Sequence, residues 1–300
     1  MTKCLPLTDP DNLWSFCPST PAAVLFTALF GITTVVHTFQ ASKFRATFCW
    51  TIIMGGAWET ISFAIRIISI RNPTSQGPYT PWFLLFLLAP LWINAFDYML
   101  LGRMVFQYLP NQKLLGIRAK RMALLFVVLD VASFIIQIGG GIMVTSKNEN
   151  TKKMGLHIYT GGLVLQEAFI LFFLYLVVTF QRRLKKEATL EERRDAKRLL
   201  LFLYITLTLI SLRVIYRILE FADYNSALTK ELWFKEAYQY GLDAAPMFLA
   251  LIAGNILHVG TVIPGNKNKF IPIPGRPVEL NNKVGNGYNG SSEGVVYNHA

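Results

Sequence analysis

Apolar residues form seven long runs along the first 260 residues of the chain. The runs cover residues 22–40, 48–70, 81–102, 122–146, 155–181, 199–220 and 237–260. A helix needs roughly 20 apolar residues to span about 30 Å of hydrocarbon, whereas barrel strands are short and alternate apolar with polar positions. Because backbone groups in lipid must pair within their own segment, the pattern predicts an all-α, polytopic membrane protein, a bundle of seven transmembrane helices.

Composition agrees with this interpretation and outlines three regions. The chain is 53% hydrophobic and 16% charged, which is too apolar for a water-soluble domain of 300 residues. Residues 1–21 form a predicted extracellular segment without a removable signal peptide, and residues 22–260 form the transmembrane domain. Residues 261–300 are rich in Gly, Pro and Asn without an apolar period, which predicts a disordered cytosolic tail.

The basic residues are distributed unevenly between the two sides of the predicted bundle. The net charge of +11 would suggest nucleic acid in a soluble protein, but here 18 Lys and Arg fall on one side against seven on the other. The positive-inside rule therefore places the N-terminus outside and the C-terminus in the cytosol, and we expect no nucleic-acid partner. The charged loop 181–198 favours helix continuation beyond the membrane, and it is either a solvated topogenic loop or a contact for anionic lipid.

Cysteine and histidine residues give no sign of a metal site. Cys4 and Cys17 share the predicted outer segment, where a disulfide is possible but not required by the sequence. Histidines are scattered singly, which argues against a zinc-dependent membrane hydrolase, and no GxSxG sequence is present. The last run contains no lysine that could hold retinal. We therefore expect no enzyme activity, no metal and no cofactor.

Three acids lie near the middle of predicted helices, namely Glu59, Asp130 and Glu167. A charge at the bilayer centre costs about 2.5–3.5 kcal/mol on insertion scales, so each acid should face the bundle interior. No base lies at the same predicted depth, so each carboxyl group is either protonated or awaits a cation. Both states suit transport of a polar cargo or a proton, whereas the alternative is a protonated acid that only joins neighbouring helices.

Further charged residues lie away from the middle. Arg213, Arg217 and Glu220 follow i, i+4, i+7 spacing and therefore share one helix face. We interpret the arginines as structural partners in interhelical ion pairs, with lipid headgroup binding as the alternative. Asp97 and Arg103 are predicted to brace the cytosolic rim. Residues assigned to the outer half are Arg66, Arg213, Arg217, Glu220, Glu236 and Asp243.

Prolines and glycines mark possible irregularities. Pro90 and Pro246 lie deep inside the third and seventh runs, where each frees a carbonyl and permits a kink. Glycines at 139–141 and 161–162 permit close helix packing, and the alternative is a lateral gap for an acyl chain.

The order of these residues resembles the fungal RTA-like family of lipid-translocating exporters. The similarity covers about 240 residues and rests on order and spacing together. The positions that carry it are Trp58-Glu59 with Arg66, Leu88-Ala89-Pro90, Tyr98, Leu101-Gly102-Arg103, Asp130 with Ser133, Gln137 and 139–141, Gly155, Gly161-Gly162-Leu163 with Gln166, Arg213 with Tyr216-Arg217 and Glu220, then Glu236, Tyr238, Asp243, Pro246-Met247 and His258. A proline expected beside His258 is replaced by Val259.

The resemblance implies a seven-helix protein of the plasma membrane that exports or flips sphingoid long-chain bases and confers resistance to toxic amphiphiles. Its partners would be membrane lipids and an amphiphilic substrate. No Walker motif is present, so we expect translocation without ATP. The alternative is a seven-helix receptor or membrane stress sensor. Candidates for substrate binding or proton relay are Glu59, Asp130, Glu167, Gln137, Gln166 and Asp243.

Overall fold

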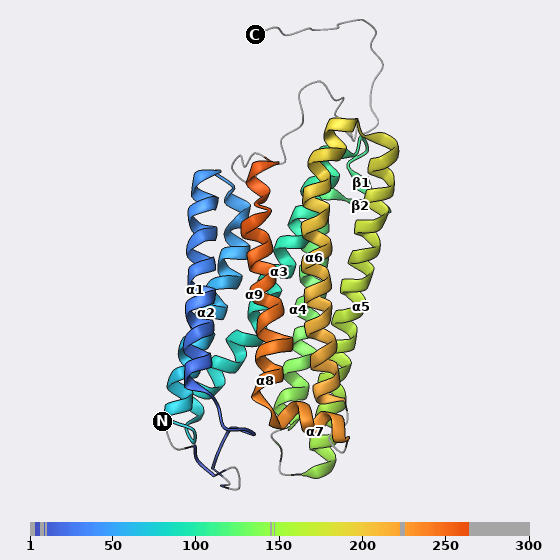
Figure 1. The fold of residues 1–300 in the computed structure, drawn as a ribbon. Coiled ribbons are helices and arrows are strands. Elements are labelled where there is room, and N and C mark those ends of the chain that lie inside the picture. Colours follow the sequence, from blue (N-terminus) through green and yellow to red (C-terminus); the bar gives the residue numbers. More distant parts are fainter. Residues whose placement is uncertain are drawn as a thin grey trace, which may run out of the picture.

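The computed structural model describes residues 4–6, 9, 11–144, 146, 148–222 and 226–263, and these form an almost entirely helical bundle (Figure 1). Most of the predicted cytosolic tail lies outside the described residues. The elements are α1 (Thr20–Lys43), η1 (Thr47–Cys49), α2 (Trp50–Arg71), α3 (Gln76–Tyr108), β1 (Lys113–Leu114), β2 (Ile117–Arg118), α4 (Ala119–Val144), α5 (Glu149–Glu187), α6 (Leu190–Phe221), α7 (Ala227–Phe234), α8 (Glu236–Tyr238), η2 (Gln239–Ala244), α9 (Ala245–Ile256) and η3 (Val259–Thr261).

The prediction of seven spanning helices is confirmed. Seven segments of the described chain are long and apolar enough to cross a membrane, and the last of them covers Glu236–Thr261. The surface of the bundle carries many exposed aliphatic side chains, such as Val35 at 68% and Ile142 at 66% exposure. Contiguous apolar surface on this scale is what a lipid-facing exterior requires. The chain is a multi-pass membrane protein.

Helices α5 and α6 extend beyond the bilayer-sized runs, as the charge spacing predicted. Only Ala188 and Thr189 separate them. The Thr189 hydroxyl caps the start of α6 by accepting from the Glu192 amide at 3.4 Å, and the Glu192 carboxylate accepts from the Thr189 amide at 2.9 Å. This reciprocal capping box satisfies two amides that a helix start leaves without partners.

The spanning helices form a closed ring. Neighbours along the chain pack together from α1 to α6, and α9 then lies between α6 and α1. Helix α3 also contacts α5 and α6, so it runs through the interior of the bundle. Figure 1 shows the short β1–β2 ladder at one end and residues 11–19 with α7 at the other. We call these the hairpin end and the N-terminal end.

The kink expected at Pro246 takes the form of a π-helical turn. Residues Gln239–Ala244 wind as π-helix immediately before α9, whose first turn contains Pro246. Proline donates no amide hydrogen and its ring displaces the carbonyl four residues earlier, so the preceding turn widens. The wider turn rotates the side chains before it relative to those of α9, and Asp243 is one of them.

Glycines bring α4 and α5 into close contact at some positions and leave open space at others. A Cβ at Gly140 would lie 2.7 Å from the Gly155 carbonyl oxygen, and one at Gly162 would lie 2.7 Å from a carbon of Gln137. By contrast, a Cβ at Gly139, Gly141 or Gly161 would meet nothing within 4 Å. One face therefore packs closely, as the first sequence interpretation expects, and the gap for an acyl chain stays a prediction.

The segment before α1 folds back onto the N-terminal end. Cys4 and Cys17, the pair named as a possible disulfide, are joined by one. The Leu13 amide donates to the Pro73 carbonyl at 3.1 Å, and the Ser15 hydroxyl donates to the Trp233 carbonyl at 3.0 Å. The segment thereby connects the loop before α3 with α7, a short helix that the apolar pattern did not predict.

Candidate functional site

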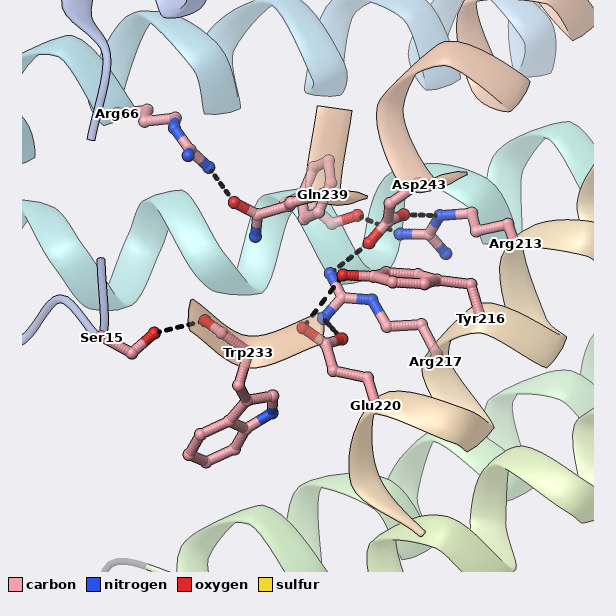
Figure 2. Close-up of polar contacts among 10 residues, drawn as sticks. Ser15, Arg66, Arg213, Tyr216, Arg217, Glu220, Trp233, Gln239 and Asp243 are labelled. Carbon is pink, nitrogen blue, oxygen red and sulfur yellow. Dashed lines mark hydrogen bonds and ion pairs between the residues drawn. The ribbon is translucent and has the colours of Figure 1, made fainter. Parts of the chain in front are cut away.

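Asp243 lies between two arginines of α6. Its Oδ1 pairs with the Arg213 guanidinium, and its Oδ2 lies 2.5 Å from Arg217 Nη2. The three side chains are almost completely buried. Arg213 also donates to the Phe86 carbonyl of α3 at 3.1 Å, so the cluster joins three elements (Figure 2). Interhelical pairing of these arginines is the arrangement favoured by the sequence spacing.

Glu220 lies one turn further along α6, on the side of the cluster nearest α7. Its carboxylate accepts from Arg217 Nη1 at 3.0 Å and from the Tyr216 hydroxyl at 3.2 Å. Figure 2 shows Arg217 between Glu220 and Asp243, so one guanidinium holds two carboxylates. A carboxylate can accept about four hydrogen bonds, and these two leave acceptor capacity free for a ligand.

Arg66 forms a second centre at the N-terminal end. It donates to Gln239 Oε1 at 2.7 Å and to Glu236 Oε1 at 2.8 Å. Its guanidinium carbon lies 4.7 Å from the ring centre of Trp82 and 5.0 Å from that of Trp14, within range of cation–π attraction. Glu236 in turn accepts from the Ser19 amide at 2.8 Å, which fixes the start of α1.

The sequence predicted no basic residue near Glu59, and the structure shows that this expectation was wrong. The Glu59 side chain is fully buried on α2 and interacts electrostatically with Arg213 and Arg217, as well as with Asp243. The predicted depth separated Glu59 from these residues because it assumed straight helices perpendicular to the membrane. Neither Glu59 oxygen has a hydrogen-bond partner within the described chain. It is an acid at the edge of the ion cluster.

Asp130 and Glu167 have neutral hydrogen-bond partners instead of basic neighbours. Asp130 on α4 accepts from the Tyr98 hydroxyl at 2.8 Å and from Asn94 at 3.0 Å, so neutral donors of α3 satisfy one oxygen. Glu167 on α5 is half-buried and hydrogen-bonds to Ser211 of α6. Within the described residues, no hydrogen bond or ion pair joins the three central acids to one another, so they do not form one constellation.

The remaining polar candidates named from the sequence are Gln137, Gln166, Asp97 and Arg103. Gln137 donates to Gln166 at 3.0 Å, which links α4 with α5. Asp97 is fully buried beside Thr206 of α6 and accepts no hydrogen bond from Arg103. The expected brace between the two is not formed, because a separation of six residues points side chains to different helix faces. The Arg103 guanidinium instead lies 4.0 Å from the ring centre of Phe48.

Two neighbouring cavities lie at the N-terminal end, and the first of them is bordered by the ion cluster. The first, which we call the polar pocket, has a volume of about 340 Å³ and includes Arg217, Glu220 and Gln239 in its wall. The second, which we call the apolar pocket, has a volume of about 400 Å³ and lies between α3 and α4. The two cavities lie side by side, because they share five wall residues, namely Leu13, Tyr79, Phe83, Gly141 and Tyr159.

The walls of the polar pocket contain several residues that the sequence did not single out. Trp14 and Phe16 come from the segment before α1, and Trp233 comes from α7. Neither element has an apolar run long enough to attract notice. A signal was nevertheless present, because aromatic residues gather where a membrane meets water.

Charges near the site but outside the spans behave as ordinary surface groups. Glu231 and Lys235 pair on and just after α7, with Oε1 and Nζ 2.6 Å apart. The Lys235 ammonium holds the pKa of the exposed Glu231 carboxyl below its usual value. Among the described residues, no group of three or more His, Cys, Asp or Glu is placed to bind a metal ion.

Comparison with known proteins decides the family. The family model described as "RTA1 like protein" matches residues 52–266. The chain belongs to the RTA1-like family. This RTA1-like protein is 37% identical over 292 residues to the "Probable lipid transporter atnI" of Emericella nidulans, an alignment that covers 89% of the chain and 75% of that relative. The resemblance drawn from the residues is confirmed.

Two further relatives show the range of names in the family. The "Lipid-translocating exporter-like protein RTA1" of Leptosphaeria maculans is 27% identical over 89% of this RTA1-like chain, which spans 55% of that relative. The "Protoporphyrin uptake protein 1" of Saccharomyces cerevisiae is 35% identical over 67% of the chain and 65% of its own length. No solved structure matches the chain.

Proposed function

We propose that this protein is a membrane transporter or translocation factor for amphiphilic lipids that carry a cationic amine. The observation that carries the proposal is the junction of the two pockets at the N-terminal end. One pocket has charged and aromatic walls and the other has apolar walls, as an amphiphile's head and tail require. The relative named as a probable lipid transporter supports the same class of cargo.

The charges around the polar pocket favour a cation over an anion. Three arginines of the site face four acids, and Asp243 and Glu220 share Arg217. The carboxyl groups therefore outnumber the guanidinium groups by one, so the site offers more acceptors to an amine than cations to an anion. The group consists of Arg66, Arg213 and Arg217 with Glu59, Glu220, Glu236 and Asp243.

The aromatic wall provides a second source of attraction for an amine. Trp14, Trp82 and Trp233 line the polar pocket together with Tyr79 and Tyr159. Ring faces attract a cation with about 0.5–1 kcal/mol at exposed sites and more when water is excluded. In the proposed complex the amine lies near Glu220, and these rings enclose it.

The apolar pocket suits the tail. It is bordered by Leu84 and Leu87 of α3 and by Phe134 and Ile138 of α4. Ile142, on the same side of α4, is 66% exposed on the bundle surface. A tail can therefore extend from the pocket towards lipid, with Gly141 leaving the passage wide. Sphingoid long-chain bases have this combination of amine and chain, and they are the proposed substrates.

We also propose that the N-terminal end faces outward, that the protein acts at the plasma membrane and that its transport confers resistance to toxic amphiphiles. The surplus of Lys and Arg on the hairpin side supports the orientation.

The test is reconstitution in liposomes with a fluorescent long-chain base and its uncharged N-acetyl derivative. The wild-type protein should move the amine faster than protein-free liposomes do, and faster than it moves the N-acetyl derivative. Glu220→Gln should remove that preference, whereas Glu231→Gln, which alters an exposed acid at the same end, should retain it. Movement no faster than in protein-free liposomes would overturn the proposal and favour a receptor.

A further inference from the structure

A basic and apolar groove lies at the hairpin end, away from the polar pocket. It has a volume of about 780 Å³, opens to the surroundings and runs from the β1–β2 hairpin along α4. Arg118 and Arg121 line one part, and Leu124, Leu125 and Val128 line the rest. We propose that this groove binds one anionic phospholipid of the surrounding leaflet, with the phosphate on the arginines and an acyl chain along α4.

The helix geometry places charge and apolar surface in the order that a phospholipid presents them. Arg121, Leu124, Leu125 and Val128 follow i, i+3, i+4, i+7 spacing and therefore share one face of α4. Leu124 is 66% exposed and Val128 is 56% exposed, so neither is covered by another part of the described protein. The arginines stand at the helix start, and the aliphatic side chains follow towards the middle of the membrane.

Unbalanced positive charge supports an anionic ligand. Lys113 lies directly opposite Arg118 in the two-residue ladder. Like charges in that position destabilise a strand pair unless something neutralises them. Among the described residues, Lys113, Arg118 and Arg121 form no ion pair with a carboxylate. A second, smaller cavity on the other side of Arg118 is lined by Lys113 and Lys120.

The hairpin tip supports a lipid source for the phosphate. Leu115 and Gly116 form the tip with φ angles of 48° and 82°. Leucine rarely adopts such a conformation, where Asn, Asp or Gly is usual. Leu115 is nevertheless 44% exposed at the tip. An apolar side chain held at the tip beside basic residues fits a hairpin that touches the headgroup region of a bilayer.

The test measures binding of fluorescent phosphatidylserine to the purified full-length protein in uncharged detergent. Loss of two arginines that each contact the headgroup should weaken binding about 25-fold, from roughly fivefold for each basic residue. The variant Arg118→Gln/Arg121→Gln is compared with Lys185→Gln/Lys186→Gln, which removes two charges from the last turn of α5 at the same end. Leu124→Gln is compared with Leu201→Gln, which changes another exposed leucine, on α6.

The proposal expects weak binding in the arginine variant and in Leu124→Gln, near-normal binding in both controls, and no displacement by inorganic phosphate. Equal losses in the arginine and lysine variants would mean diffuse attraction to charge and would overturn it. Displacement by inorganic phosphate at concentrations comparable to the lipid would identify a free-anion site and would also overturn it. Size-exclusion profiles that match the wild type establish that each variant is folded.

Discussion

Arg217 and Asp243 pair between α6 and the π-helical turn before α9, with Nη2 and Oδ2 2.5 Å apart. The same guanidinium holds Glu220 at the wall of the polar pocket. Arg217 therefore connects the pocket with the last spanning helix. A ligand that alters the position of Glu220 acts on the residue that holds this turn in place.

Replacing Arg217 tests the structural part of this connection. Arg217→Gln leaves Asp243 with one basic partner and Glu220 with none of the ion pairs found here. Breaking a buried pair from one side costs about 3–5 kcal/mol. We expect a loss of that size in the free energy of unfolding, measured with denaturant in detergent micelles. Lys235→Gln, which removes an exposed pair, should change it by less than about 1 kcal/mol. Equal losses in both variants would contradict the structural role.

The glycines of α4 should differ in their tolerance of a methyl group. Gly140→Ala places a carbon against the backbone of α5, which should destabilise the protein by about 1–3 kcal/mol through overpacking. Gly139→Ala adds the same atom where nothing lies within 4 Å and should be nearly neutral. Thermal unfolding of the two variants in one detergent makes the comparison. A larger loss for Gly139→Ala would mean that the helix faces are assigned incorrectly.

The disulfide should stabilise the cover of the polar pocket. Cys4→Ser/Cys17→Ser opens a loop with a sequence separation of 13, and closing a loop of about 15 residues contributes about 3 kcal/mol in the chain-entropy model. Because Leu13, Trp14 and Phe16 line the pocket, we expect weaker amphiphile binding and faster proteolysis near residue 10. A reducing agent should reproduce this effect in the wild type and add nothing in the double variant. Unchanged amphiphile binding in both experiments would mean that the disulfide does not stabilise the pocket.

Asp130 and Glu167 should affect translocation more than binding. Neither lines the polar or the apolar pocket, yet both lie within the membrane on α4 and α5. Asp130→Asn and Glu167→Gln should bind a cationic amphiphile normally and lose its passage across liposome membranes, with surface expression intact. Binding and transport assays on the same preparations measure the separation. Normal transport by both variants would remove these acids from the pathway.

The apolar pattern predicted the spans because lipid imposes one length and one polarity on every spanning helix. Residues sharing a helix face were also predictable, and the cluster of Arg213, Arg217 and Glu220 follows directly from helical spacing. The candidate site could be predicted only to this extent, since spacing on one helix does not identify the partners on another.

The parts of the site that the sequence did not predict depend on contacts between segments far apart in the chain. Asp243 reaches both arginines from a π-helical turn, whose register differs from that of the regular helix assumed for the last run. Trp14 reaches Arg66 because the segment before α1 folds back over the bundle. The hairpin at Leu115 was not predicted, because leucine at positive φ lacks the usual turn signature.

The central claim is that the pocket beside Glu220 recognises a cationic amine, and equilibrium binding to purified protein tests it most directly. A fluorescent long-chain base and its N-acetyl derivative are titrated into the wild type, Glu220→Gln and Glu231→Gln. The account predicts that the wild type and Glu231→Gln bind the amine more tightly than the uncharged derivative, and that Glu220→Gln binds both alike. A preference for the amine that persists in folded Glu220→Gln, or is absent from the wild type, would contradict it.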